Sequence, residues 1–195
     1  MRVLYVSLII VIVDQVSKLA VKGISISVLG LDWQGMPYGA SRQVFGDFFR
    51  LTYIENPGMA FGLEPGGKLF FSLFSLVASI AIAAYLFHVR RERLGFRVAL
   101  AMVLGGAVGN LIDRMFYGVI FGDAPLFFGK VVDFLDFDFI NISIGNFHMT
   151  RWAVFNAADA CVTVGVVLLM LFHPSTHTTH KVSAEESGQG TDARG

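Results

Sequence analysis

The stretch FRVALAMVLGGAVGNLIDRMFY, residues 96–117, decides the class of this protein. It is apolar over enough length to cross a bilayer, which takes roughly 20 mostly apolar residues. Near its end, however, stand Asn110, Asp113 and Arg114, at positions i, i+3 and i+4 of one helix. An ionisable side chain in the hydrocarbon core costs at least about 3 kcal/mol, so such residues mark a functional site by default.

Three further segments have the length and composition of spanning helices, at residues 3–21, 68–87 and 152–172. Over all 195 residues, 54% are hydrophobic and 15% are charged, which is more apolar than a soluble domain of this length can bury. The first segment is interrupted by Asp14 and Lys18 and has no small-residue cleavage site after it, so we expect it to be retained. The sequence predicts an α-helical polytopic membrane protein with four transmembrane helices.

Basic residues predict the orientation of these helices. Arginines cluster between the second and third segments, and one precedes the first: Arg90, Arg91, Arg93, Arg97 and Arg2. Because cytoplasmic segments carry the positive charge, both termini are expected in the cytoplasm. The connections at about 22–67 and 118–151 then lie outside, where loose alternation over 45–54 and 130–144 predicts a small β-rich cap. Residues 1–173 form the predicted membrane domain, and the polar residues 174–195 a disordered cytoplasmic tail.

The polar residues of the predicted spans gather at one depth. At a rise of about 1.5 Å per residue, those of the first and third spans lie roughly 17 to 27 Å from the cytoplasmic side. Asn156 and Asp159 descend from the other side and lie about 6 to 10 Å below the outer end of the last span. All of them therefore converge on the outer half of a bilayer whose core is about 30 Å thick.

Such residues can also simply hold helices together. That interpretation suits Asp14 with Lys18, which stand one helical turn apart, and Asp113 with Arg114. Because Asp113 points about 100° away from Arg114 around the helix, we expect Arg114 to be held by acceptors on another span or an outer loop.

Asp133 and Asp159 differ, since neither has a cationic neighbour in the sequence. Two unpaired carboxylates close together leave one protonated and one ionised, which suits acid and base chemistry on a water molecule. Asp136 and Asp138 crowd the same segment, so chemistry alone does not select Asp133. A transporter or channel subunit with an ion path, or an inactive membrane scaffold, stays open as an alternative.

Five sequence motifs narrow the choice between acid and base chemistry, an ion path and a scaffold. They are DQVSK at 14–18, NPGMAFG at 56–62, GGAVGNLIDR at 105–114, VVDF at 131–134 and FNAAD at 155–159. In this order, and on these predicted spans, they resemble the bacterial lipoprotein signal peptidases, or signal peptidase II. The resemblance covers residues 14–171 and leaves out the polar tail.

The resemblance implies that Asp133 and Asp159 form a catalytic pair. It implies that the site is lined by Asn56, Gly58, Asn110, Arg114 and Asn156, which would bind substrate or hold the aspartates, and that Asp14 and Lys18 support it from beneath. The sequence departs from the pattern of the family at Ala160, where relatives commonly have a serine after the aspartate.

The implied activity is that of an aspartic endopeptidase, which needs no metal and no cofactor. It would hydrolyse a prolipoprotein just before its diacylglyceryl-modified cysteine and release the signal peptide. The expected setting is the bacterial inner membrane with the site facing outward, and the expected partners are the lipid-modified substrate and membrane lipids. We expect a monomer, and the net charge of +0 argues against a nucleic-acid partner.

Overall fold

The computed structural model describes residues 1–26, 30–58, 67–138, 142–144, 147–149 and 152–172. Within them, three helical stretches are long and apolar enough to cross a membrane. They are α1 (Leu4–Lys22), α2 (Gly67–His88) and a continuous run comprising α3 (Leu94–Ile112), the π-helical turn η2 (Asp113–Tyr117) and α4 (Gly118–Ile120). These stretches match the first three predicted spans closely.

The helix α5 (Ala157–Leu171) is shorter than the span predicted from residue 152. The prediction is wrong at its beginning, because the backbone of Phe155 pairs with that of Leu135 and keeps residues 152–156 out of the helix. At about 1.5 Å per residue, its 15 residues reach only about 22 Å. The fourth crossing therefore stays a prediction, and the predicted tail at 174–195 lies outside the described residues.

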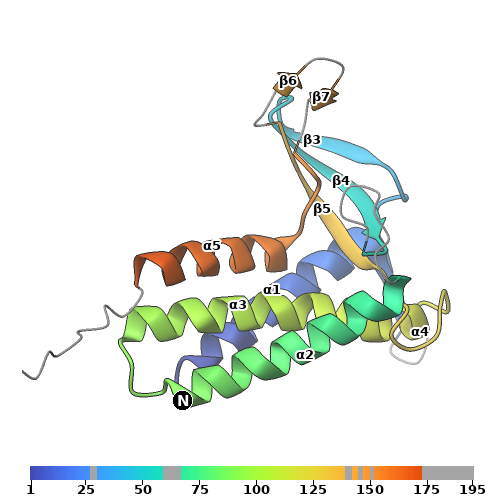
Figure 1. The fold of residues 1–195 in the computed structure, drawn as a ribbon. Coiled ribbons are helices and arrows are strands. Elements are labelled where there is room, and N and C mark those ends of the chain that lie inside the picture. The colour runs from blue at the N-terminus through green and yellow to red at the C-terminus, as the bar shows by residue number, and fades with distance from the viewer. Residues whose placement is uncertain (27–29, 59–66, 139–141, 145–146, 150–151, 173–195) are drawn as a thin grey trace, which may run out of the picture.

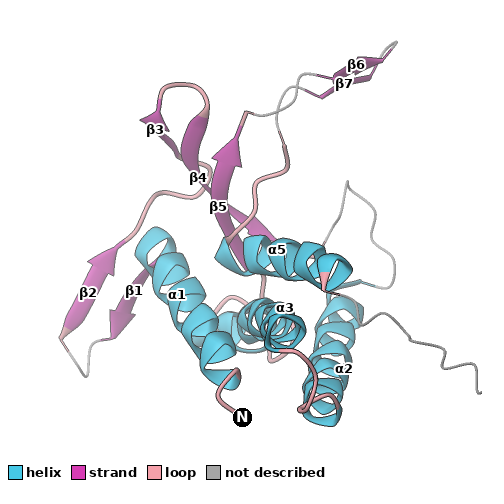
Figure 2. Cartoon of the chain, turned by 90° about the vertical axis from the view of Figure 1, so that its left-hand side faces the viewer, coloured by secondary structure: helices cyan, strands magenta, loops and turns pink. Residues whose placement is uncertain are grey.

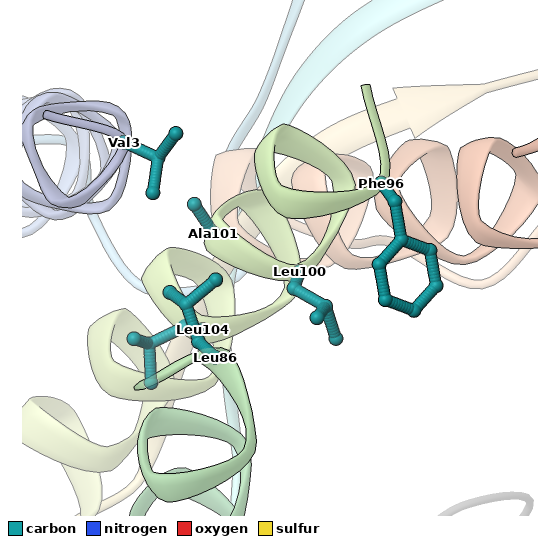
Figure 3. Packing of buried hydrophobic residues seen from close by; sticks show 6 residues of the cluster. All are labelled: Val3, Leu86, Phe96, Leu100, Ala101 and Leu104. Atoms are coloured by element: carbon teal, nitrogen blue, oxygen red, sulfur yellow. The ribbon is translucent and has the colours of Figure 1, made fainter. Parts of the chain in front are cut away.

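The helix α3 lies at the centre of the bundle and packs against α1, α2 and α5 (Figures 1 and 2). At the end of the bundle near the N-terminus, the residue that caps α1 joins α2 and α3 in a hydrophobic cluster formed by Val3, Leu86, Phe96, Leu100, Ala101 and Leu104 (Figure 3). Towards the other end α3 carries Gly109, where an added Cβ would stand 2.6 Å from Oδ2 of Asp14. A small residue is needed there because α1 comes so close.

The strands lie at the opposite end of the bundle from the α2–α3 connection (Figure 1). The strands β1 (Gly23–Ile26) and β2 (Leu31–Gln34) form an antiparallel hairpin that the sequence analysis did not anticipate. The order of the three-stranded antiparallel sheet is β3 (Ser41–Phe45), β4 (Phe49–Asn56) and β5 (Val131–Phe137), and β6 (Ile142–Ile144) pairs with β7 (Phe147–Met149). The strand predicted over 45–54 is thus divided by a turn, in which Gly46 has a positive φ of 53°.

The strand β5 joins the sheet to the helices. Alternate residues of a strand point to opposite sides. On one side, Val132 and Phe134 pack in a core with Val21, Tyr53 and Tyr117. Asp133 lies between them in sequence and is only 2% exposed. The packing of β5 on the end of α1 and on η2 therefore fixes the backbone that carries Asp133.

Candidate active site

Asp133 and Asp159 both contact one residue, Asn156. Asn156 is the N-cap of α5: its Oδ1 accepts a hydrogen bond from the backbone N–H of Asp159 at 3.0 Å, and Oδ2 of Asp159 accepts from the backbone N–H of Asn156 at 3.3 Å. This reciprocal capping box fixes the first turn of the helix. The Nδ2 group of Asn156 also donates to Oδ1 of Asp133 at 2.6 Å. A single buried asparagine thus contacts both carboxylates.

Each carboxylate accepts a further amide hydrogen bond. Asn56 Nδ2 donates to Oδ2 of Asp133 at 3.2 Å, and Asn110 Nδ2 donates to Oδ1 of Asp159 at 2.8 Å. None of the ion pairs among the described residues involves Asp133 or Asp159. Burial, with the nearby charge of Asp159, raises the pKa of Asp133 to about 7, above its ordinary 3.8. The pair can therefore hold one proton near neutral pH.

Lys18 lies beneath the pair and is fully buried. Its Nζ is 2.7 Å from Oδ2 of Asp14 and 2.8 Å from Oδ2 of Asp113, and it donates to Oδ1 of Asn110 at 2.9 Å. An ammonium has three donors and no acceptor, so these three contacts satisfy it. Because Asn110 must turn its carbonyl oxygen towards Lys18, its NH₂ group faces Asp159.

The two carboxylates bound to Lys18 also hold the backbone next to the pair. Oδ1 of Asp14 accepts a hydrogen bond from the backbone N–H of Ala158 at 3.0 Å, and Oδ2 of Asp113 accepts from that of Val132 at 3.1 Å. Ala158 precedes Asp159, and Val132 precedes Asp133. The cluster of Lys18, Asp14 and Asp113, here called the buried ion cluster, thus anchors both elements that carry the pair.

Gln15 and Tyr117 complete the buried ion cluster, although the sequence analysis did not select them. The side-chain amide of Gln15 donates to Oδ1 of Asp113 at 2.9 Å, and the hydroxyl of Tyr117 donates to Oε1 of Gln15 at 3.0 Å. An amide inside an apolar span, directly after Asp14, was the signal that could have identified Gln15.

Arg114 is held differently from the prediction. Its Nη1 donates a hydrogen bond to the backbone carbonyl of Asn110, one turn earlier in the same helical run, at 3.4 Å. Its Nε is buried and has no hydrogen-bond partner among the described residues. The predicted acceptors on another span or outer loop are therefore not found in this part of the chain. Asp113 does not pair with Arg114, because it is already bound to Lys18.

Asn56 is fixed by the turn that follows β4. Its Oδ1 accepts a hydrogen bond from the backbone N–H of Gly58 at 2.9 Å. Gly58 has a φ of 101°, and an added Cβ would stand 2.8 Å from Cδ2 of Phe71. Glycine is therefore required for this conformation and this close approach. The remainder of the NPGMAFG motif, at 59–62, lies outside the described residues.

An open cavity of about 370 Å³ lies along α5 and has Asp159 in its wall. Its other walls are mostly apolar and come from Trp152, Phe155, Ala160, Thr163 and Val164. The hydroxyl of Thr163 is satisfied within the helix, since it donates to the backbone carbonyl of Asp159 at 2.9 Å. In Figure 1 the sheet β3–β4–β5 extends beyond the bundle on the same side as α5. The Asp159 end of the pair is thus the one that opens onto an apolar space.

The chain matches the family model described as "Signal peptidase (SPase) II" over residues 6–173. It is 35% identical to the lipoprotein signal peptidase of Porphyromonas gingivalis over 194 residues, covering 86% of this chain and 80% of that protein. It is 40% identical to the lipoprotein signal peptidase of Desulfitobacterium hafniense over 134 residues, covering 68% and 74%.

Its fold is similar to that of a bacterial membrane enzyme solved by the in meso method at 1.9 Å resolution, with a TM-score of 0.63 at 29% identity over 87% of this chain and 90% of that one. The resemblance drawn from the motifs is confirmed by these matches. Together with three apolar helices of spanning length, they make the protein a multi-pass membrane peptidase. The chain belongs to the signal peptidase II family, the lipoprotein signal peptidases.

Proposed function

We propose that this chain is an aspartic endopeptidase that removes signal peptides from diacylglyceryl-modified prolipoproteins, with Asp133 and Asp159 as its catalytic pair. The observation that carries the proposal is the position of Asn156, which donates to Asp133 while it caps the helix whose first turn carries Asp159. Among the described residues both carboxylates are held by amides and neither is bound to a cation, so they are free to exchange protons with a substrate and a water molecule.

The surroundings of the two carboxylates suggest different roles. Asp133 is buried and has a pKa raised to about 7, so we assign it the proton. Asp159 borders the open cavity and acts as the ionised base. In the first step Asp159 takes a proton from water, the water oxygen attacks the scissile carbonyl carbon, and Asp133 gives its proton to the carbonyl oxygen. In the second step the tetrahedral intermediate collapses: Asp159 protonates the departing amine, and Asp133 recovers its proton from a hydroxyl of the intermediate.

The apolar cavity beside Asp159 supports a lipid-bearing substrate. In the proposed reaction the scissile bond directly precedes the lipidated cysteine. The acyl chains of the bound substrate must therefore extend out of the site from a point only a few bonds away from the carboxylates. The cavity offers such an exit along Ala160, Thr163 and Val164. Val164 is exposed on α5, so the cavity continues into the lipid-facing surface of that helix.

The proposed setting is the bacterial inner membrane, with four crossings and the site facing outward. The arginines near 90–97 support this orientation, since they lie at the end of the bundle opposite to the strands (Figure 1). Both termini are then cytoplasmic. We propose that the protein acts as a monomer, because both carboxylates and their amide donors come from one chain.

The test is cleavage of a diacylglyceryl-modified prolipoprotein by the purified protein in detergent. Asp133→Asn and Asp159→Asn should each lower the rate by about 1000-fold or more while the protein stays folded, because an amide cannot exchange the proton. Asp136→Asn and Asp138→Asn are the matched controls on the same segment and should retain most of the rate. Full activity of the Asp133→Asn variant would show that Asp133 and Asp159 are not the catalytic pair. Absence of cleavage by the parent protein would favour a transporter or a scaffold instead.

A further inference from the structure

The hairpin β1–β2 has one apolar and one polar side. Its register places Ile24 opposite Trp33 and position 26 opposite position 31, both pairs being of apolar residue types. Between these pairs, Ser25 is opposite Asp32. Directly opposed residues lie on the same side of a two-stranded sheet, and neighbours along a strand lie on opposite sides. Positions 24, 26, 31 and 33 therefore share one side of the hairpin.

Two residues of the apolar side are largely uncovered by the described chain. Leu31 is 52% exposed and Trp33 is 57% exposed. In the described chain β1 and β2 pair only with each other, and a lone two-stranded hairpin is marginally stable in water. An exposed apolar face on such a hairpin needs a partner that covers it.

The covalent connection places this face at the boundary of the membrane. The strand β1 begins at Gly23, directly after the last residue of the spanning helix α1. The indole N–H of Trp33 donates to the backbone carbonyl of Ala20 at 3.0 Å, which is one of the last carbonyls of α1 and lacks a partner in the helix. The ring of Trp33 thus lies beside the end of α1, whose Val13 and Val16 are also exposed. In Figure 2 the hairpin extends sideways from the end of α1, away from α3 and α5.

We propose that the apolar side of β1–β2 rests in the phospholipid leaflet at which α1 ends, at the boundary between headgroups and acyl chains. Tryptophan is enriched at this depth because its ring is apolar and its N–H needs a hydrogen-bond acceptor. An open cavity of about 370 Å³ next to the hairpin supports the same partner. Its walls combine Ile24, Trp33 and Phe121 with the charged Lys22 and Asp123, as a site between lipid chains and headgroups requires. The hairpin thereby fixes the depth of α1, and with it that of Lys18 one turn below Lys22. This contact does not depend on the reaction proposed for the aspartates.

The two tryptophans of the chain, Trp33 and Trp152, make the proposal testable by fluorescence. The variant Trp152→Phe leaves Trp33 as the sole tryptophan. We would place one copy per lipid nanodisc, in phosphatidylcholine that is unlabelled, brominated near the headgroup or brominated near the chain ends. Bromine near the headgroup should lower Trp33 emission about twofold or more, bromine near the chain ends should lower it less, and dissolved iodide should have little effect.

Two outcomes would overturn the proposal. Strong quenching by iodide with none by brominated lipid would place Trp33 in water. Protection from both quenchers in single-copy nanodiscs would mean that the chain itself covers the face.

Paired charge insertions in the Trp152→Phe background test which side of the hairpin contacts lipid. Leu31→Asp puts a carboxylate on the apolar side and should reduce quenching by lipid about twofold or more. Ser25→Asp puts the same charge on the other side and should leave it unchanged. Equal effects of the two variants would contradict the proposed orientation.

Discussion

Lys18→Met is the most demanding test of the buried ion cluster. Methionine keeps most of the length of the side chain but removes all three contacts of Nζ. Two of these, to Asn110 in α3 and to Asp113 in η2, join α1 to the neighbouring helical run, and such interhelical hydrogen bonds contribute about 0.6 to 1.7 kcal/mol each in membrane proteins. Their loss alone would lower the free energy of unfolding by about 1 to 3 kcal/mol.

The larger loss of stability comes from the two carboxylates that remain in the interior. Asp14 and Asp113 are fully buried, so removal of the ammonium leaves two carboxylates in the interior without a counterion. Removing one partner of a buried ion pair typically costs about 3 to 5 kcal/mol. We therefore expect the ratio of folded to unfolded protein to fall by about two to four orders of magnitude, since about 1.4 kcal/mol is a factor of ten.

Unfolding by SDS in mixed micelles, followed by circular dichroism, measures this free energy. The matched control is Lys130→Met, because Lys130 also binds a carboxylate, that of Glu55 at 3.0 Å, but is 41% exposed. An exposed ion pair contributes only about 0 to 1 kcal/mol. If Lys18→Met were no more destabilising than this control, the buried ion cluster would not anchor β5 and α5. In the folded fraction of Lys18→Met we also expect slower cleavage, because Asn110 is no longer turned towards Asp159.

Three further predictions follow from the charges near the site. If Asp133 must donate a proton, cleavage should decline as pH rises through about 7, and a pH–rate profile that stays level from about pH 6 to 8 would contradict this role. Burial alone would raise the pKa of Glu55, but hydrogen bonds from Lys22, Tyr53 and Lys130 lower it to about 2. Its contribution to stability should therefore be complete above its ordinary pKa of 4.5 and be lost as pH falls towards about 2, a dependence that Glu55→Gln should weaken in acid unfolding curves. Arg114→Lys keeps the charge but loses the planar donors, so kcat/KM should fall about tenfold or more with little loss of folded protein, and parent-like turnover would reduce Arg114 to a point charge.

Hydropathy predicted the first three helices because length and apolar content alone determine a span. It placed the start of the last helix too early, since residues 152–156 are apolar enough to continue the pattern. Their extended form depends on the pairing of Phe155 with Leu135, which hydropathy does not encode. The capping box formed by Asn156 and Asp159 was nevertheless readable as a helix start.

The ion pairs show the limit of reasoning from one helix. The spacing of Asp14 and Lys18 predicted their contact, and the structure contains it. The bond between Lys18 and Asp113 joins two helices, so no local spacing could predict it. The π-helical turn at Asp113–Tyr117 also changes the direction of each side chain relative to a regular α-helix, on which the prediction for Arg114 rested. The hairpin β1–β2, in contrast, had a local signal in the alternation on either side of Gly30.

The use of amides alone around Asp133 and Asp159 has a physical reason. A cation in direct contact with either carboxylate would hold it ionised and remove one of the two protonation states that the proposed reaction requires. The NH₂ group of an asparagine can donate both to a carboxylate and to the carbonyl oxygen of a carboxylic acid. It favours the ionised form, but it brings no formal charge, and burial still raises the pKa of Asp133 to about 7. Lys18 is saturated by Asp14, Asp113 and Asn110 and touches neither carboxylate of the pair. Its charge tends to lower the pKa of Asp133 from a distance, and its hydrogen bond to Asn110 orients the amide that donates to Asp159. The backbone then separates the two carboxylates: Asp159 lies in the first turn of α5, where the helix dipole favours negative charge, whereas Asp133 lies on a strand, which offers no such field. The difference between helix and strand thus supports the proposed roles, with Asp159 as the base and Asp133 as the acid.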